Sequence, residues 1–473
     1  MPGGSLVFCV KASPGDSELD LEIMNSAHSH SPRQAGRTVV FLATVWPEAV
    51  SSAAGLRTEF MVRCFLRSGW RVVFGSASKE NAFSERLRAS GVECRSVFPN
   101  DEAFDHWIAE VRPDAVVYDR FVLEEQFGWR VRERFPHALR ILDTQDLHAL
   151  RRLREAGLKS EGRIPKGIPT ELLTDDFRRE LAAIYRCDLT LLVSDFEYEW
   201  LQTRGRVPEE LLLLSRWSVT SRWDLAAQAV REGFAWIGNF RHPPNLDGLF
   251  WFAREIWPRV RILVGPQAKV RIYGAYPPRA VMQLHAPELG FLVEGSVPDQ
   301  YEALSRAWVN LAPLRYGAGI KGKILDGWSV GTPVVSTSVG AEGMRRGLTP
   351  AGALSSALPF GGWIADSAED FAQACATALE AGLRSKLGAA GERDSEWNQA
   401  QERGFYLLET FYHETTEAAR VQDRVERLLS ELTVFRARNV VGQILEHQSL
   451  QASRYLSKWI ETKAKLASEP LPQ

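Results

Sequence analysis

From residue 38 onward, short apolar segments alternate with segments whose apolar residues have helical spacing. The first apolar segment, residues 38–45, is followed by a small-residue loop at 51–55 and by helical spacing over 57–68. Further apolar segments at 71–74, 92–97, 115–118, 140–142 and 189–193 continue the series. Strands separated by helices pair in parallel through right-handed crossovers. The alternation therefore predicts the α/β class, and a second series from about 234 to about 380 predicts a second domain of the same kind.

The length of 473 residues exceeds what one core organises and suits two domains with additional segments. We predict a disordered leader at 1–36, a first domain at 37–220, a second at 221–394, an amphipathic helix at 395–413 and a charged helical tail at 414–473. The tail has a coiled-coil-like seam at 421, 425, 428, 432 and 435. The seam is short, which favours an internal helical hairpin over an oligomerisation stalk. The tail is also the expected element for protein contacts.

Charge and cysteine content narrow the classes of function. A formal net charge of −2 gives no footprint for nucleic acid. The five cysteines are scattered and have no CxxC spacing, which argues against a disulfide framework or a zinc site. This cysteine usage predicts a reducing compartment, and we expect a cytoplasmic protein. No apolar run reaches the roughly 18 residues that a membrane-spanning helix needs.

The most informative motif lies between two apolar segments, at 308–314 and 333–336. A glycine turn is followed by a short helix that carries two lysines and an aspartate. These residues are Gly317, Ala318, Gly319, Lys321, Lys323 and Asp326, and Gly331 is placed to end the helix.

In such a unit, free backbone N–H groups and the positive end of the helix converge, and this arrangement suits a phosphate. Lys321 and Lys323 add charge, and Asp326 could accept hydrogen bonds from a ribose diol. An ordinary strand–helix turn is the alternative, in which the glycines only permit a tight connection. The lysines, the aspartate and the Pro-Val-Val at 333–335 favour a nucleotide-diphosphate site.

This segment resembles the donor-site signature of family-4-type retaining glycosyltransferases of the GT-B fold (glycosyl transferases group 1). The matching residues are Gly317, Gly319, Lys323, Asp326, Gly331, Pro333, Val334 and Val335. Residues 236–245 resemble the strand and phosphate loop that open the family's second domain, with Gly238 in the loop and Arg241 near its basic position. The resemblance covers about 38–413 and is strongest over 235–344.

The resemblance implies two Rossmann-like domains that face each other across a cleft, with the helix at 395–413 crossing back to the first domain. It implies transfer of a sugar from a nucleotide sugar to an acceptor hydroxyl, with retention of configuration. Neither a metal nor a cofactor is expected, because the helix dipole, Lys323 and Arg241 stand where a cation would at the diphosphate.

The sequence departs from the family's pattern at two positions. The second member of the family's carboxylate pair is Asp326, which is one methylene shorter than glutamate, and the first position holds Ala318. In related enzymes the first carboxylate often touches the donor sugar. Two alternatives arise: a non-catalytic scaffold that binds a nucleotide sugar, and a sugar-nucleotide epimerase of the same architecture.

The resemblance assigns catalytic roles to His148, Arg241 and Lys323. His148 follows the apolar segment at 140–142, at the carboxyl end where α/β sheets place ligands. The alternative is a helix capped by Asp146 beside an inert His148. Arg241 could clamp the pyrophosphate with two hydrogen bonds, or form a surface ion pair.

The acceptor side is assigned to the first domain. Gly55 and Arg57 belong to the loop that lines the cleft in the family, although a simple tight turn would explain them as well. Asp146 is the third expected acceptor contact. Arg315 precedes the glycine turn and would either join the anion site or lie on its rim.

Overall fold

The computed structural model describes residues 36–49, 51–162, 174–228, 230–349, 353–387 and 395–468. The leader expected at 1–36 lies, apart from Gly36, outside the described residues. The domain boundaries proposed from the sequence stay predictions. Both sheets and all the helices named in the next paragraphs belong to one compact unit that begins at Gly36.

The first sheet contains seven parallel strands in the order β3-β2-β1-β4-β5-β6-β7. The strands are β1 (Thr38–Ala43), β2 (Arg71–Ser76), β3 (Glu93–Ser96), β4 (Ala115–Asp119), β5 (Leu139–Asp143), β6 (Leu189–Leu192) and β7 (Leu212–Leu214). β1 is buried along its whole length, as expected for a central strand covered on both faces. The order reverses between β1 and β4, and such a switch point is where open α/β sheets bind ligands.

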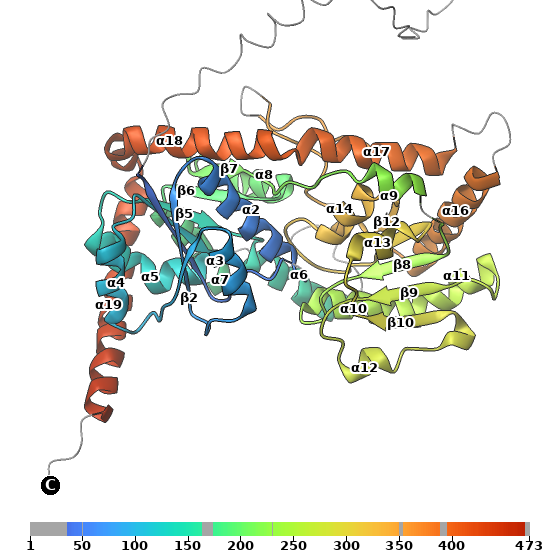
Figure 1. Cartoon of the computed structure of the whole chain (residues 1–473), viewed down its shortest axis with the longest axis horizontal. Coiled ribbons are helices and arrows are strands. Elements are labelled where there is room, and N and C mark those ends of the chain that lie inside the picture. The colour runs from blue at the N-terminus through green and yellow to red at the C-terminus, as the bar shows by residue number, and fades with distance from the viewer. Residues whose placement is uncertain are drawn as a thin grey trace, which may run out of the picture. The chain divides into compact units, whose positions relative to one another are not determined.

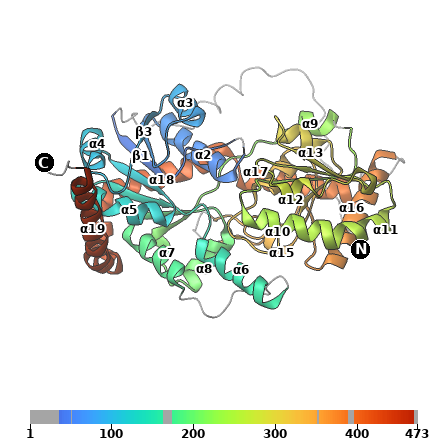
Figure 2. The same ribbon diagram turned by 90° about the horizontal axis from the view of Figure 1, so that it is seen from below.

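Helices connect these strands and cover the sheet (Figures 1 and 2). They are α2 (Ala53–Arg67), α3 (Ala82–Ala89), α4 (Ala103–Val111), α5 (Arg120–Arg134), α6 (His148–Glu161), α7 (Asp175–Arg186) and α8 (Asp195–Thr203). α8 follows β6, and its N-terminus is capped by the Ser194 side chain, which accepts a hydrogen bond from the Glu197 N–H.

The second sheet contains six parallel strands in the order β10-β9-β8-β11-β12-β13. They are β8 (Phe234–Ile237), β9 (Val270–Tyr273), β10 (Phe291–Gly295), β11 (Val309–Ala312), β12 (Val334–Ser336) and β13 (Gly362–Ile364). The main helices around it are α9 (Trp223–Gln228), α10 (Pro243–Trp251), α11 (Trp257–Val264), α13 (Gln300–Ser305), α14 (Gly322–Ser329), α15 (Ser338–Ala341) and α16 (Ala368–Leu387). Two parallel sheets with interleaved helices confirm the predicted α/β class.

Two consecutive helices, α17 (Glu396–Phe411) and α18 (Glu414–Arg438), connect the two domains. α17 packs against α14, α16 and β13, whereas α18 packs against α2 and β5, so the chain returns to the first domain (Figure 1). The seam of α18 is buried there, not paired along its length with α19 (Val440–Ser468). The expected helical hairpin is therefore wrong, because this seam completes the core of the first domain. Among the described residues, no helix has the length and apolarity to cross a membrane.

Candidate functional site

The predicted glycine turn connects β11 to α14 at the carboxyl edge of the second sheet. Gly319 has φ +65°, and a Cβ at this position would lie 2.9 Å from the Cβ of Asp146. Only glycine satisfies both the left-handed backbone and the close approach. At the other end of α14, Gly331 has φ +63° and its N–H donates to the Trp328 carbonyl at 3.0 Å. The predicted helix end is confirmed.

Lys323 lies in the first turn of α14 and is only 8% exposed. Its Nζ donates to Asn245 Oδ1 at 2.8 Å and lies 4.3 Å from the centroid of the Trp236 ring. Burial lowers the pKa of Lys323 to about 7, although the Asp326 carboxylate acts in the opposite direction. The ammonium group is thus held by an amide and a ring face, neither of which carries a compensating charge.

Asn245, in the first turn of α10, and Gly238, in the loop after β8, fix this environment. The Asn245 Nδ2 donates to the Asn239 carbonyl at 2.9 Å, which leaves its Oδ1 to face Lys323. A Cβ at Gly238 would lie 2.9 Å from the Asn245 Nδ2 and 2.9 Å from the Trp236 ring. A side chain at position 238 would therefore displace Asn245 or Trp236, the two residues that contact Lys323. The sequence analysis missed Asn245 and Trp236, because nothing in their spacing distinguishes them from helix and strand residues.

Lys321 and Asp326 complete the buried charges of the turn. The Lys321 Nζ donates to the Gly319 carbonyl at 2.8 Å, and burial lowers the pKa of Lys321 to about 8 against the opposing effect of Glu342. Burial likewise raises the pKa of Asp326 to about 7, with Arg222 and Lys323 acting in the other direction. Lys321, Lys323 and Asp326 are thus three buried ionisable side chains at the start of α14.

The first domain holds this turn through two side chains that the sequence analysis missed. Glu197 of α8 accepts hydrogen bonds on Oε1 from the N–H of Gly319 at 2.7 Å and of Leu147 at 2.9 Å. Arg154 of α6 donates to the Gly317 carbonyl at 2.8 Å and forms a two-bond ion pair with Glu342. Both partners on the turn are backbone atoms, which leave no signature in a sequence.

Ala318 belongs to the apolar cluster that also contains Leu147 and Leu150 of the first domain. It is 9% exposed. The alanine that stands in place of the family's carboxylate is therefore packed against the first domain.

His148 begins α6 and lies two residues beyond Asp146, which borders Gly319 of the glycine turn. Its Nε2 is 3.5 Å from Asp146 Oδ1, and its ring packs edge-on against Phe121. Burial lowers the pKa of His148 to about 4 despite the Asp146 carboxylate, so the imidazole is neutral at pH 7. The proposed alternative of an Asp146 cap is wrong: the first N–H groups of α6 donate to the Glu180 carboxylate instead, at 2.7 and 2.8 Å.

Asp146 lies between the glycine turn of the second domain and His148 of the first domain. It borders Gly319, pairs with Arg151, and lies close enough to His242 for the two to interact electrostatically. Although burial opposes the change, Arg151 and His148 help to lower the pKa of Asp146. The structure thus brings Asp146 to the glycine turn, with His148 beside it.

Two arginines near the site are engaged elsewhere. The Arg241 guanidinium is exposed and lies 3.5 Å from the centroid of the Tyr276 ring, whose hydroxyl donates to Glu48 at 2.6 Å. Its role as a pyrophosphate clamp stays a prediction. Arg315 forms an ion pair with Asp247, with Nε 2.9 Å from Oδ2, which fits the rim position.

The acceptor contact expected at Arg57 requires a correction, whereas the one expected at Gly55 stays a prediction. Arg57 is 0% exposed; its Nε donates to Asp143 Oδ1 at 2.8 Å and its Nη1 to the Ser215 carbonyl at 2.7 Å. An acceptor has no surface of Arg57 to touch, so this side chain joins α2 to the sheet instead. Gly55 lies in the first turn of α2, and a Cβ there would lie 2.4 Å from the Glu48 carbonyl carbon, so glycine permits a close approach of two backbone segments.

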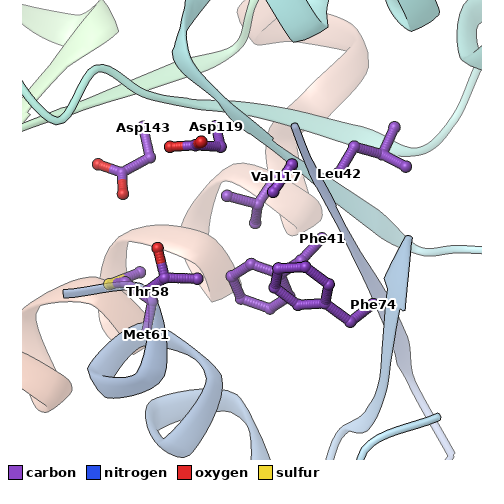
Figure 3. A pocket seen from close by; sticks show the side chains of 9 residues that line it. Phe41, Leu42, Thr58, Met61, Phe74, Val117, Asp119 and Asp143 are labelled. Atoms are coloured by element: carbon purple, nitrogen blue, oxygen red, sulfur yellow. The ribbon is translucent and has the colours of Figure 1, made fainter. Parts of the chain in front are cut away.

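A small cavity of about 10 Å³ lies beside these residues, at the carboxyl ends of β1, β4 and β5 (Figure 3). Thr58, Asp119 and Asp143 supply its polar atoms. Arg120 and Gln145, which follow β4 and β5, have φ of +67° and +61°, a costly conformation for these residue types. The cavity has room for about one water molecule and none for a sugar.

The comparisons with known proteins agree with this architecture. Residues 231–381 match the family model of Glycosyl transferases group 1. None of the curated proteins matches the chain.

Among solved structures, the fold is similar to that of a glycosyltransferase from Rickettsia africae, with TM-score 0.58 and 10% identity over 83% of this chain and 98% of that one. It is also similar to HepE from Anabaena in complex with UDP (TM-score 0.59, 12% identity, 83% and 100% of the chains). Sucrose-phosphate synthase from Thermosynechococcus elongatus is a further match (TM-score 0.57, 14% identity, 83% and 100%).

Two Rossmann-like domains, each built on a parallel sheet, define the GT-B fold, as the resemblance predicted. The second half of the chain contains a glycosyl transferases group 1 domain.

Proposed function

We propose that the chain transfers a sugar from a nucleoside-diphosphate sugar to an acceptor hydroxyl with retention of configuration. One observation carries this proposal: Lys321 and Lys323 are buried at the start of α14, and their hydrogen-bond acceptors are a carbonyl and an amide oxygen. A buried ammonium group without a bonded counter-charge is costly unless an anion supplies that charge. A diphosphate in the glycine turn would do so.

In this proposal the donor's diphosphate accepts hydrogen bonds from Lys323, Lys321 and the free N–H groups at the start of α14. Negative charge develops on the departing nucleotide during transfer. Cations and N–H groups that already point to that place stabilise the transition state without reorganisation. Asp326, one turn further along α14, would accept hydrogen bonds from the ribose.

The first domain would supply Asp146 and the neutral imidazole of His148 to the reacting sugar or acceptor. A neutral imidazole can donate or accept a hydrogen bond without adding a second positive charge next to Arg151. Arg241 would reach the diphosphate by leaving the Tyr276 ring. Neither a metal nor a cofactor has a part in the proposal.

UDP is the first ligand to test, because a protein of similar fold, HepE from Anabaena, was solved with UDP. Titration calorimetry with UDP, UMP and uridine separates the diphosphate from the nucleoside. We expect affinity to increase in the order uridine, UMP, UDP. Equal affinity for UMP and UDP would contradict binding of the diphosphate at the turn. The same series with GDP and ADP tests which base is preferred.

Turnover with candidate acceptors separates the rival functions. Retaining transfer is supported if nucleotide is released only when an acceptor is present. NMR of the product should then show the same anomeric configuration as the donor. Release without any acceptor indicates the epimerase alternative, and binding without turnover indicates the scaffold. His148→Ala should lower turnover at least roughly tenfold while UDP binding persists; equal turnover would remove His148 from the reaction.

A further inference from the structure

The last helix, α19, has its polar side turned toward the protein. Glu446 pairs with Arg140, Glu461 pairs with Arg130, and Arg454 lies 2.9 Å from Glu133. These contacts hold α19 against the first domain, where it packs on α5 and α7 (Figures 1 and 2). This is the reverse of an ordinary surface helix, which turns its apolar face inward.

Polar groups also line the middle of this inner face. Ser457 is buried, and its hydroxyl accepts a hydrogen bond from Arg130 Nη2 at 3.2 Å and donates to Asn100 Oδ1 at 3.0 Å. At the first turn, a Cβ at Gly442 would lie 2.2 Å from the Tyr185 carbonyl, so the helix meets α7 backbone to backbone. α19 is thus a fixed part of the first domain.

The outer side of α19 is apolar and exposed. At 100° per residue, the large exposed apolar side chains that the structure describes on α19 beyond its first residue fall within about a third of the helix circumference, opposite the ion-paired residues. They are Val441, Ile444, Tyr455, Leu456, Trp459 and Leu466, each between 47% and 65% exposed. An apolar stripe of this length on an exposed helix face indicates a binding surface for a membrane or for another protein.

The charges on the outer side of α19 favour one kind of binding partner. Both glutamates of α19 are directed inward and neutralised, whereas Lys458 and Lys463 are exposed at the stripe, with the Lys463 Nζ 5.1 Å from the centroid of the Trp459 ring. Two copies of this face would bring lysines against lysines. Apolar residues with a tryptophan, a tyrosine and lysines only are complementary to anionic lipid.

We propose that the outer face of α19 docks the enzyme on an anionic lipid surface. Val441, Ile444, Leu456 and Leu466 enter the acyl boundary, Trp459 and Tyr455 lie at the headgroup level, and Lys458 and Lys463 meet lipid phosphates. The ion pairs of the inner face keep the helix parallel to the first domain while it lies on the surface.

Vesicle co-sedimentation of the full chain tests the proposal. The chain should sediment with vesicles in which about a third of the lipid is phosphatidylglycerol, and at least roughly tenfold less with phosphatidylcholine alone. The double variant Leu456→Glu, Trp459→Glu should lose at least roughly tenfold of the binding at an unchanged melting temperature, since both side chains are exposed.

A matched control carries the same change of charge and apolarity elsewhere. Ile262 and Tyr406 are 82% and 58% exposed on α11 and α17, and Ile262→Glu with Tyr406→Glu should bind vesicles as the parent does. Lys458→Gln with Lys463→Gln should reduce binding to the anionic vesicles only.

Two results would overturn the proposal. One is equal sedimentation of the parent and the Leu456, Trp459 variant. The other is absence of vesicle binding together with a dimer, seen by light scattering, that the same variant dissociates; the face would then join two copies of the chain.

Discussion

Buried charged residues lie at the carboxyl edges of both sheets, but their partners differ. At the first sheet the charges neutralise one another: Arg57 pairs with Asp143, and Arg120 pairs with Asp119. At the second sheet, Lys321 and Lys323 are buried beside neutral acceptors. A charge in a direct ion pair holds the fold together, whereas a buried ammonium group whose hydrogen bonds go to neutral acceptors is available to an anionic ligand. Substitutions at both edges can test this distinction.

Removing one member of the neutralised pair should have the largest effect. Arg57→Ala leaves Asp143 buried without its counter-charge, which typically costs about 3–5 kcal/mol of stability. Denaturant unfolding of the variant measures this cost. Arg57→Met with Asp143→Leu should recover most of the stability, because the two charges vanish together. If Arg57→Ala is as stable as the parent, the first edge is not held by this pair.

The next effect concerns Glu197, which joins the two edges. Burial raises its pKa to about 7, so its protonated form is favoured in the folded state. This contribution is complete below the unfolded pKa near 4.5 and is lost as the pH rises to about 7. Glu197→Gln has no such proton to lose, so its stability relative to the parent should improve between pH 5 and pH 8, by roughly 2–3 kcal/mol. Denaturant unfolding of the parent and the variant at pH 5 and pH 8 measures this change. If the stability difference between the two proteins is the same at both pH values, burial does not raise the pKa of Glu197 as argued.

At the second edge, loss of a charge should affect the ligand more than the fold. Lys323→Met keeps the length of the side chain and removes the buried ammonium group. Affinity for UDP should fall by about 1.5–3 kcal/mol, the range for hydrogen bonds to charged groups. The melting temperature should stay the same or rise, in contrast to Arg57→Ala. If Lys323→Met lowers the melting temperature and leaves UDP affinity unchanged, Lys323 stabilises the fold and does not bind the ligand.

The smallest effect is expected for Asp326. Asp326→Asn should weaken binding of a ribonucleotide donor by about 1 kcal/mol, the value for one ordinary hydrogen bond. The 2′-deoxy donor already lacks one partner hydroxyl, so its affinity should change less. Calorimetry with the two donors compares them directly. An equal loss for both would make Asp326 a local partner of Lys323 and not a contact of the ribose.

The sequence predicts the second domain better than the first, for a physical reason. Gly319, Lys323 and Gly331 act through local geometry, namely a turn, a first helical turn and a helix end, and local geometry follows from spacing. Arg57 acts through Asp143 and Ser215, residues far along the chain, so its loop position gave no sign of its burial. Glu197 and Arg154 bind backbone atoms of the other domain, and Ala318 packs there as well. Contacts of this kind depend on how the two domains meet, which no local pattern encodes. The α18 seam was recognised for the same local reason, but its partner was not.

The hold of the first domain on the glycine turn has a kinetic consequence for the proposed function. Glu197 and Arg154 bind Gly319 and Gly317 across the domains. If the turn binds the donor as proposed, release of the spent nucleotide would require these contacts to break as the domains separate. We then expect the steady-state rate to fall as the viscosity of the medium rises.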